Sequence, residues 1–215
     1  MTAVIDNLPL LLEGFRTTLA LVLISSVFAL TIGIVLAGMR VSPVPLLRSF
    51  GAGYVECLRN VPTAVVFFFV LFALPQMGVR IGFFPAAVVT LSLYYAAFFC
   101  EVVRSGINAV PVGQAEAARS VGLTFGRSLR FVILPQAIRA VVPPMLNVFV
   151  ALTKSTAIAS AFGVAELLAT TTALVTVESD AVLWILAVSA VLYLVITIPA
   201  GLIAERIEKK VAAAR

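Results

Sequence analysis

The sequence Glu116-Ala117-Ala118-Arg119-Ser120-Val121-Gly122, with Val132-Ile133-Leu134-Pro135 beginning ten positions after Gly122, is a polar segment inside a strongly apolar chain. It belongs to the stretch 104–139, which carries five arginines between long uncharged runs. Good helix formers fill Gln114–Val121, and Gly122 can take the left-handed conformation that ends a helix. We therefore predict a short polar helix that stands between membrane spans.

A second, amphipathic helix is expected after this glycine turn. Thr124 is its candidate N-cap, and Phe125, Leu129 and Val132 recur on one face at helical spacing. Pro135 is expected to close the unit, because proline cannot donate the backbone hydrogen bond that a helix interior needs. The stretch 104–139 is thus predicted to form a helix, a turn and a second helix.

Two functions suit such a unit, and the residues alone leave both open. In the first, the leading helix inserts into a groove on another protein. Ala117, Ala118 and Gly122 would allow close backbone approach there, while Glu116 and Arg119 would offer opposite charges. In the second, the unit lies on the bilayer surface with its arginines against lipid phosphates.

The composition of the chain indicates a membrane protein. Apolar residues make up 62% of the 215 positions and charged residues 12%, whereas a soluble domain has roughly 45–50% and about 25%. The net charge of +5 comes from arginines and lysines scattered through membrane-flanking segments. That distribution follows the positive-inside rule and does not indicate nucleic-acid binding.

The residue types also argue against catalysis. Histidine is absent, so the commonest metal ligand and the commonest general base near neutral pH are missing. Cys57 and Cys100 lie in or beside apolar segments, a spacing that suits neither a disulfide framework nor a metal site. The chain has no phosphate-binding Gly-x-x-x-x-Gly-Lys-Ser/Thr loop. We expect no catalytic residue, no metal site and no enzyme activity.

Four uncharged intervals are long enough to cross a hydrocarbon core of about 30 Å. They contain 23, 20, 20 and 24 residues, in the order Thr17–Met39, Asn60–Val79, Ile81–Cys100 and Ala181–Ala204. The region Ala140–Val177 is divided by Lys154 into a piece that is too short to cross alone and a longer piece. It therefore contributes either one crossing, with the remainder outside or re-entrant, or two.

The distribution of arginine and lysine favours five crossings. With five crossings and an external N-terminus, the inner segments hold 12 of these residues and the outer segments 3, whereas six crossings give 8 and 7. The positive-inside rule then places the stretch 104–139 and the C-terminus in the cytoplasm. The interrupted stretch after Thr153 falls toward the outer side, where irregular backbone indicates a cavity or a translocation path.

Several polar residues are candidates for a gate or a translocation path. Glu101 and Arg104, three positions apart on one helix, are predicted to pair at the inner end of the third span. Lys154 either reaches the outer interface or lines a pore. The small residues Ser155, Thr156 and Ser160 line the path or bond to helix backbone. Glu166, by contrast, is expected to be a solvated charge or a contact for an external protein.

The segment Glu116–Pro135 resembles the EAA motif of bacterial ABC importer permeases. That pattern is Glu-Ala-Ala, three residues, Gly, nine residues, Ile, one residue and Leu-Pro, and this chain differs only in Val132 at the isoleucine position. Further similar segments extend over most of the chain and indicate the polar amino-acid branch of these permeases, most like the glutamate-uptake permeases of actinobacteria. These segments are Thr17–Leu19, Arg59–Pro62, Glu101–Ile107, Gly113-Gln114, Pro135–Ala137 and Leu152–Thr156.

The resemblance implies a fold and a set of partners. The fold is an all-α membrane protein, the type I ABC importer permease fold, with about five transmembrane helices in a single domain over 1–215 and a coupling loop at 104–139. The partners are two ATP-binding subunits, a second permease subunit that is identical or homologous, an extracytoplasmic amino-acid-binding protein and membrane lipid. The chain itself needs no cofactor, since ATP and magnesium would bind to the partner ATPase.

The resemblance also implies roles for particular residues. Residues of the EAA segment would form the coupling helix in the cleft of the ATPase, namely Glu116, Ala117, Ala118, Arg119, Gly122 and Leu123. We accordingly predict a multi-pass permease of the cell membrane that imports polar amino acids of the glutamate, glutamine and aspartate class. The alternatives are an importer of basic amino acids and a non-transporting interfacial or receptor subunit.

Overall fold

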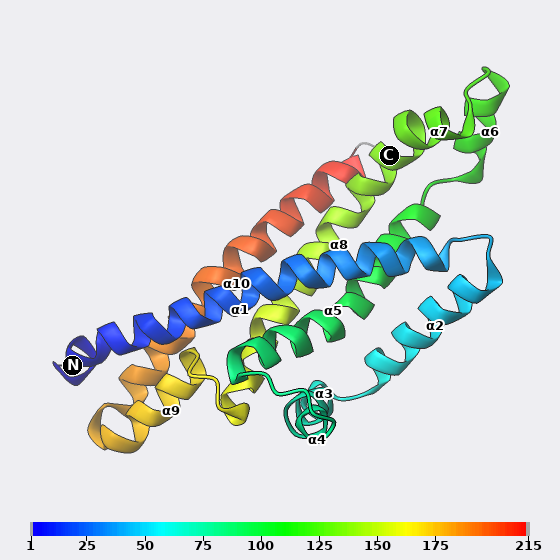
Figure 1. The fold of residues 1–215 in the computed structure, drawn as a ribbon. Coiled ribbons are helices and arrows are strands. Elements are labelled where there is room, and N and C mark those ends of the chain that lie inside the picture. Colours follow the sequence, from blue (N-terminus) through cyan, green and yellow to red (C-terminus); the bar gives the residue numbers. More distant parts are fainter. Residues whose placement is uncertain (1, 214–215) are drawn as a thin grey trace.

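Long helices lying side by side form most of the molecule, as Figure 1 shows for this computed structural model. The structure describes the backbone of residues 2–213 and the side chains of residues 4–210. The long helices are α1 (Thr2–Arg40), α5 (Phe83–Asn108), α8 (Leu134–Ser155) and α10 (Val182–Ala213). No strand occurs within residues 2–213, so the prediction of an all-α protein is confirmed.

Shorter elements connect these helices. Between α1 and α5 lie α2 (Pro45–Asn60), α3 (Thr63–Phe68), the π-helical turn η1 (Phe69–Ala73) and α4 (Leu74–Gln76). Between α5 and α8 lie α6 (Val112–Ser120), α7 (Phe125–Ser128) and the π-helical turn η2 (Leu129–Ile133). Between α8 and α10 lie the 3₁₀ helix η3 (Thr156–Phe162), α9 (Leu167–Val177) and the 3₁₀ turn η4 (Ser179–Ala181).

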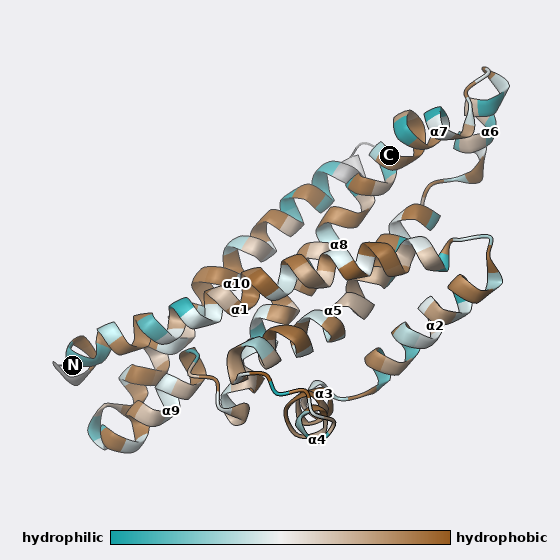
Figure 2. Cartoon of the chain, viewed as in Figure 1, coloured by the Kyte–Doolittle hydropathy of each residue, from teal (hydrophilic) through white to brown (hydrophobic). Residues whose placement is uncertain are grey.

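The outer surface of the helices is apolar, as expected for a protein in lipid. Leu183 is 81% exposed and Ile5 is 68% exposed. Figure 2 shows hydrophobic residues along most of α1, α5 and α10, with hydrophilic residues concentrated in the coupling loop and toward the chain ends. A soluble protein rarely leaves so much large apolar surface in water, whereas hydrocarbon covers it at no cost.

The path of the chain through the bundle matches five crossings. Helix α1 begins at one end of the bundle, and α10 ends at the other, the end that carries α6 and α7 (Figure 1). Within the described residues, four helices are long and apolar enough to cross a membrane, and counting the bent pair formed by α2 with α3–α4 as one span gives five.

The second predicted span, Asn60–Val79, is not one straight helix, so that prediction is wrong. The chain bends by 106° between α2 and the helical segment Thr63–Gln76. Val61 has extended backbone angles, φ −103° and ψ 136°. The residue before a proline is pushed out of the helical region by the proline ring. Pro62 therefore ends α2, and a new helix starts in another direction.

The region Ala140–Val177 also differs from the prediction. A continuous helical segment runs from Phe125 to Phe162, so the piece before Lys154 is part of a crossing helix and is not too short. Pro143 and Pro144 lie inside α8 without ending it. The rest of the region turns at Gly163, whose φ is +84°, and forms the short helix α9.

Two π-helical turns explain why Leu-Pro pairs do not end these helices. Leu74-Pro75 directly follows η1, and Leu134-Pro135 directly follows η2. A proline lacks the N–H donor, and its ring clashes with the carbonyl four residues earlier. A π turn bonds residue i to i+5 and displaces that carbonyl. Pro135 therefore sits in the first turn of α8 and does not close the coupling loop, contrary to the prediction.

Small residues bring α1 close to α5. Ala29, Gly33 and Ala37 recur every four residues on the buried face of α1. A Cβ atom added at Gly33 would lie 2.7 Å from Cβ of Phe99 and 3.0 Å from the carbonyl oxygen of Ala96. Gly38 is one position off this stripe and has no neighbour within 4 Å of such an atom. The close approach of α1 to α5 therefore depends on Gly33 and does not involve Gly38.

A buried carboxylate links three helices at the end of the bundle that carries the N-terminus. Glu166 is completely buried and caps α9, accepting a hydrogen bond of 2.8 Å from the backbone N–H of Ala169. Its other oxygen accepts bonds from the hydroxyls of Thr18 on α1, at 3.3 Å, and Tyr193 on α10, at 2.9 Å. The prediction of a solvated Glu166 is wrong, because its partners are distant in sequence.

Replacing Gly33 by leucine is expected to destabilise the protein. The added side chain would collide with Phe99 and Ala96 and separate α1 from α5, with a loss of about 1–3 kcal/mol in the free energy of unfolding. Gly38→Leu on the same helix is the matched control and should leave stability unchanged. Unfolding by sodium dodecyl sulfate, followed by circular dichroism in mixed micelles, measures both. Equal stability of the two variants would contradict the close α1–α5 contact.

Candidate functional site

The polar helix predicted from the sequence is α6, and a glycine ends it. Gly122 has φ +82°. Its N–H donates to the carbonyl of Arg119 at 2.9 Å, and the N–H of Leu123 donates to the carbonyl of Ala118 at 3.0 Å. These two bonds form the Schellman motif, which satisfies the last carbonyls of a helix when a residue after it is left-handed. The predicted glycine cap is confirmed.

The coupling loop projects from the end of the bundle opposite the N-terminus (Figure 1). Of the six predicted coupling residues, Glu116, Ala117, Arg119 and Gly122 are exposed, Leu123 is half-buried and Ala118 is buried. Ala118 and Leu123 thus support the loop from within, while the other four offer a surface to another molecule. Pro111 occupies the position just before α6, and Thr124 that just before α7.

Apolar side chains stand out from the same loop. Val121 is 76% exposed and Phe125 is 72% exposed, and they flank the turn at Gly122. A polar segment that projects beyond the membrane spans has no lipid to cover such side chains on its own. Exposed apolar groups rimmed by charges are typical of a surface that contacts another protein. The geometry therefore suits the docking function better than a loop that lies flat on the bilayer.

Glu101 is the centre of a charged cluster near the end of α5 that leads to the coupling loop. Its carboxylate accepts a hydrogen bond from Arg104 at 2.9 Å, which confirms the predicted pairing. The guanidinium of Arg40, at the end of α1, binds the other carboxylate oxygen, and Arg59 of α2 approaches that oxygen to 3.9 Å. One carboxylate therefore links α1, α2 and α5 directly before the coupling loop. The sequence gives no sign of Arg40 or Arg59 as partners.

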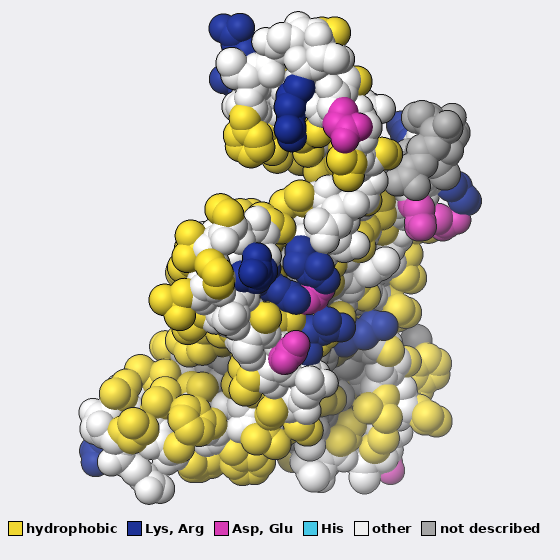
Figure 3. Space-filling model, turned by 90° about the vertical axis from the view of Figure 1, so that its right-hand side faces the viewer, with side chains coloured by type: hydrophobic (Ala, Val, Ile, Leu, Met, Phe, Trp, Pro, Cys, Tyr) yellow, Lys and Arg dark blue, Asp and Glu magenta, His cyan; other side chains and the backbone are white. Residues whose placement is uncertain are grey.

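A polar cavity of about 430 Å³ adjoins this cluster. Figure 3 shows basic and acidic side chains gathered in the middle of the face below the coupling loop, between apolar surfaces. Charged groups at this level of a membrane protein are costly unless they pair or serve a function. The cavity is lined by Arg40, Val55, Glu56, Arg59, Asn60, Phe98, Glu101 and Arg104.

The remaining candidates for the translocation path lie farther along the bundle from the coupling loop than Glu101 does. The hydroxyls of Ser155 and Tyr95 are 2.6 Å apart and join α8 to α5. Tyr95 precedes Glu101 by six residues, about 9 Å along a helix. The predicted residues therefore fall into two groups, and Tyr95, which sequence reasoning missed, marks the position of the second on α5.

Lys154, Thr156 and Ser160, the other predicted residues of the path, lie near Ser155 in the sequence and differ in their exposure to solvent. Thr156 is buried and its hydroxyl donates to the carbonyl of Thr153 at 2.7 Å, while the hydroxyl of Ser160 donates to the carbonyl of Ala157 at 2.7 Å. Both hydroxyls thus bond to helix backbone, which was one of the two predicted uses. Lys154 is exposed on the neighbouring face of the helix.

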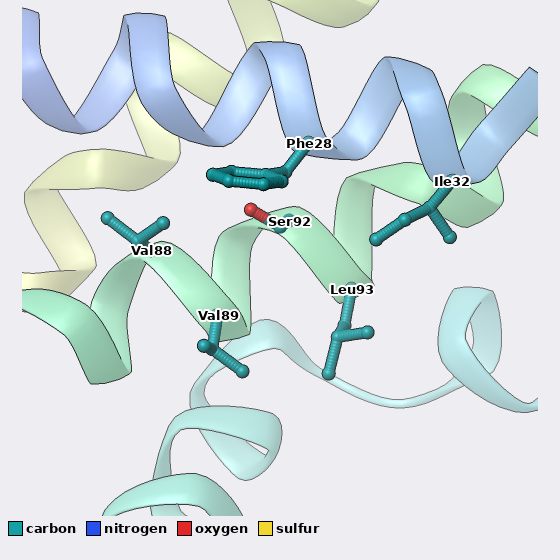
Figure 4. Close-up of a pocket in the computed structure, with 6 residues that line it drawn as sticks. All are labelled: Phe28, Ile32, Val88, Val89, Ser92 and Leu93. Carbon is teal, nitrogen blue, oxygen red and sulfur yellow. The ribbon is translucent and has the colours of Figure 1, made fainter. Parts of the chain in front are cut away.

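A second cavity, between α1 and α5, does not suit a polar ligand. It measures about 190 Å³ and is lined by Phe28, Ile32, Val88, Val89, Ser92 and Leu93. Figure 4 shows the aliphatic side chains and the ring of Phe28 around it, with the Ser92 hydroxyl as the only polar side-chain group drawn. That hydroxyl donates to the carbonyl of Ser25 at 3.5 Å.

Comparison with known proteins identifies close relatives along the whole chain. A family model described as "Binding-protein-dependent transport system inner membrane component" matches residues 29–213. The glutamate transport system permease protein GluC of Corynebacterium glutamicum is 38% identical, covering 95% of this chain and 95% of that protein. The probable glutamine ABC transporter permease protein GlnM of Bacillus subtilis is 36% identical, covering 95% and 94%.

A solved structure shares the fold. The crystal structure of an amino acid ABC transporter with histidines has a chain that is 30% identical to this one. The superposition gives a TM-score of 0.86 and covers 95% of this chain and 97% of the other. The helices, the bent pair and the coupling loop described above are therefore those of an ABC importer permease.

Neutralising the centre of the charged cluster is expected to loosen it. Within the described side chains, Glu101 is the one carboxylate that binds Arg40 and Arg104, so Glu101→Gln leaves their guanidiniums to repel each other. We expect a loss of about 1–3 kcal/mol, the usual contribution of hydrogen bonds to a charged group. Urea or detergent unfolding curves measure the change. The control is Glu205→Gln, whose exposed pair with Lys209 should contribute little; equal effects would contradict a central role for Glu101.

Proposed function

Because this chain belongs to the family of binding-protein-dependent transport system inner membrane components and is a permease subunit of an amino-acid ABC importer, we propose that it imports acidic amino acids or their amides. Relatives named for glutamate and glutamine transport support the class of glutamate, glutamine and aspartate. The three arginines around a single carboxylate at the inner end of α5 also suit substrates that carry carboxylates.

Coupling to a separate ATPase is the central part of this proposal. The observation that carries it is the capped helix α6, whose exposed Glu116, Arg119 and Gly122 project beyond the bundle. We infer that Glu116, Ala117, Arg119 and Gly122 contact the ATPase, while Ala118 and Leu123 hold the turn in shape. ATP and magnesium bind to that partner in this scheme, so the chain contributes movement and no hydrolytic chemistry.

The assembly follows from the same reasoning. Two permease subunits, identical or homologous, form the pore on two ATP-binding subunits, and an extracytoplasmic binding protein delivers the amino acid. The N-terminus lies outside and the C-terminus in the cytoplasm, since basic residues concentrate at the end with the coupling loop. When ATP binding closes the two ATPases, the coupling helices move together and the packed helices rotate as rigid bodies between two states.

We assign the polar residues within the bundle to the path and its gate. One group lies at the end of α8 and in η3: Lys154, Ser155, Thr156 and Ser160. Ser155 is bonded there to Tyr95 of α5. Glu101 and Arg104 lie at the inner end, where the ion-pair cluster joins three helices. Opening of the inner gate would change the distances within that cluster.

Reversing the charge at the coupling helix is expected to uncouple the two subunits. Glu116→Lys should weaken association with the ATPase by about tenfold or more, as removal of one central charged contact usually does. Co-purification and amino-acid-stimulated ATP hydrolysis measure the loss. Glu208→Lys is the matched control. Glu208 is an exposed glutamate near the C-terminal end of α10, which lies at the same end of the bundle as the coupling loop but outside α6. Normal association of the Glu116 variant would refute the coupling role.

The substrate class can be tested by uptake. Cells that lack this subunit should lose uptake of labelled glutamate or glutamine and keep uptake of labelled arginine, and the restored chain should recover the loss. Loss of arginine uptake alone would instead favour a transporter of basic amino acids. Unchanged uptake of all three would reject the proposed substrate class.

A further inference from the structure

We propose that the cavity between α2 and the inner end of α5 binds the ammonium and carboxylate groups of the transported amino acid, using Glu56, Arg59 and Arg104. This inference rests on the proposed function and makes it more specific. The binding site lies at the end of the bundle that carries the coupling loop, and each charged group of the ligand has its own residue there.

The size and position of the cavity suit a binding site for an amino acid. Its volume of about 430 Å³ falls within the range of roughly 300–1,000 Å³ that is typical of small-molecule sites. It lies where α5 is about to leave the bundle for the coupling loop, on the face shown in Figure 3. An amino acid held there would therefore be at the exit side of the path.

Two guanidinium groups in the cavity have unused hydrogen-bond donors. The Nε atom of Arg104 is buried and has no hydrogen-bond partner among the described residues, although the same side chain binds Glu101 through another nitrogen. Arg59 is only 3.9 Å from the nearest carboxylate oxygen, which is too far for a hydrogen bond. Guanidinium groups recognise carboxylates with paired, charge-assisted bonds. Arg59 and Arg104 both line the cavity. Each can take a carboxylate of the ligand, Arg104 once its side chain turns so that the buried Nε faces the cavity.

One carboxylate in the cavity is free to receive an ammonium group. Within the described part of the chain, the side chain of Glu56 takes part in no ion pair or hydrogen bond; only its backbone carbonyl accepts a bond, from Asn60. Glu101, in contrast, is already occupied by Arg40 and Arg104. Glu56 is thus the acceptor that remains for a primary ammonium.

The count of free charges matches an acidic amino acid. Two guanidiniums with unused donors and one free carboxylate are complementary to two carboxylates and one ammonium. The ring of Phe98 and the side chain of Val55 supply an apolar wall for the intervening methylene groups. Arg59 also lies over the Phe98 ring, with 5.6 Å between its guanidinium carbon and the ring centroid, and this cation–π contact holds the guanidinium in place.

The decisive experiment measures binding of labelled glutamate to the full-chain permease, purified with its ATPase in phosphatidylcholine nanodiscs. Glu56→Gln and Arg59→Gln should each weaken binding about tenfold, the equivalent of roughly 1.4 kcal/mol. Arg48→Gln is the matched control, because Arg48 is an exposed arginine of the same helix that does not line the cavity. Melting temperatures equal to that of the unaltered protein exclude misfolding as the cause.

Competition by 2-oxoglutarate gives a second readout that a structural role would not change. This molecule has both carboxylates of glutamate and lacks the ammonium group. It should compete poorly with glutamate on the unaltered protein, and the difference between the two should shrink in Glu56→Gln. An unchanged preference in that variant would overturn the assignment of Glu56.

The outcomes separate the site from the transport function. Suppose that glutamate uptake depends on this chain but both cavity variants bind glutamate as well as the unaltered protein. That result would refute the binding site and leave the proposed function intact. The cavity would instead hold a lipid headgroup if native mass spectrometry showed phospholipid that is lost with Arg59→Gln while glutamate binding stayed constant. Absence of uptake for every amino acid tested would refute the proposed function itself.

Discussion

The requirement that every backbone polar group be bonded within the protein determines this structure. Hydrocarbon offers no hydrogen bonds, so a chain that is 62% apolar can cross the bilayer only as helices or as a closed barrel. At two of its Leu-Pro pairs, the structure compensates for the missing donor of proline. The π turns η1 and η2 let the helices continue through Leu74-Pro75 and Leu134-Pro135. At Val61-Pro62 there is no such turn, and the helix ends.

The same requirement explains why polar side chains inside the bundle act as links between helices. Glu166 caps α9 and accepts hydroxyl bonds from α1 and α10, while the Ser155–Tyr95 bond joins α8 to α5. Each bond satisfies a buried group and fixes the relative position of two helices. Polar contacts within the bundle therefore determine which helices lie side by side and in which register.

The sequence predicts the parts of the fold that depend on composition and local pattern. The helical class, the spans at α1, α5 and α10, the cap at Gly122 and the Glu101–Arg104 pair were all accessible, because each depends on a run of residues or on neighbours within one or two turns. The partners of Glu101 and Glu166 were not, since Arg40 lies 61 residues and Tyr193 27 residues from them. The bend at Pro62 was missed because counting uncharged residues ignores the conformation that proline imposes.

The position of the charged cluster relates the coupling loop to the rest of the bundle. A load on α6 reaches α5 within a few residues, and the first charged group it meets on α5 is Arg104, paired with Glu101. Glu101 in turn binds Arg40 at the end of α1 and approaches Arg59 at the end of α2. Because Gly33 and Ala37 pack α1 closely on α5, these two helices respond as one body. Helix α2 joins the same body, because the hydroxyl of Tyr54 donates to the carbonyl of Leu93 on α5 at 2.7 Å, while Arg59 makes the longest ion pair of the cluster.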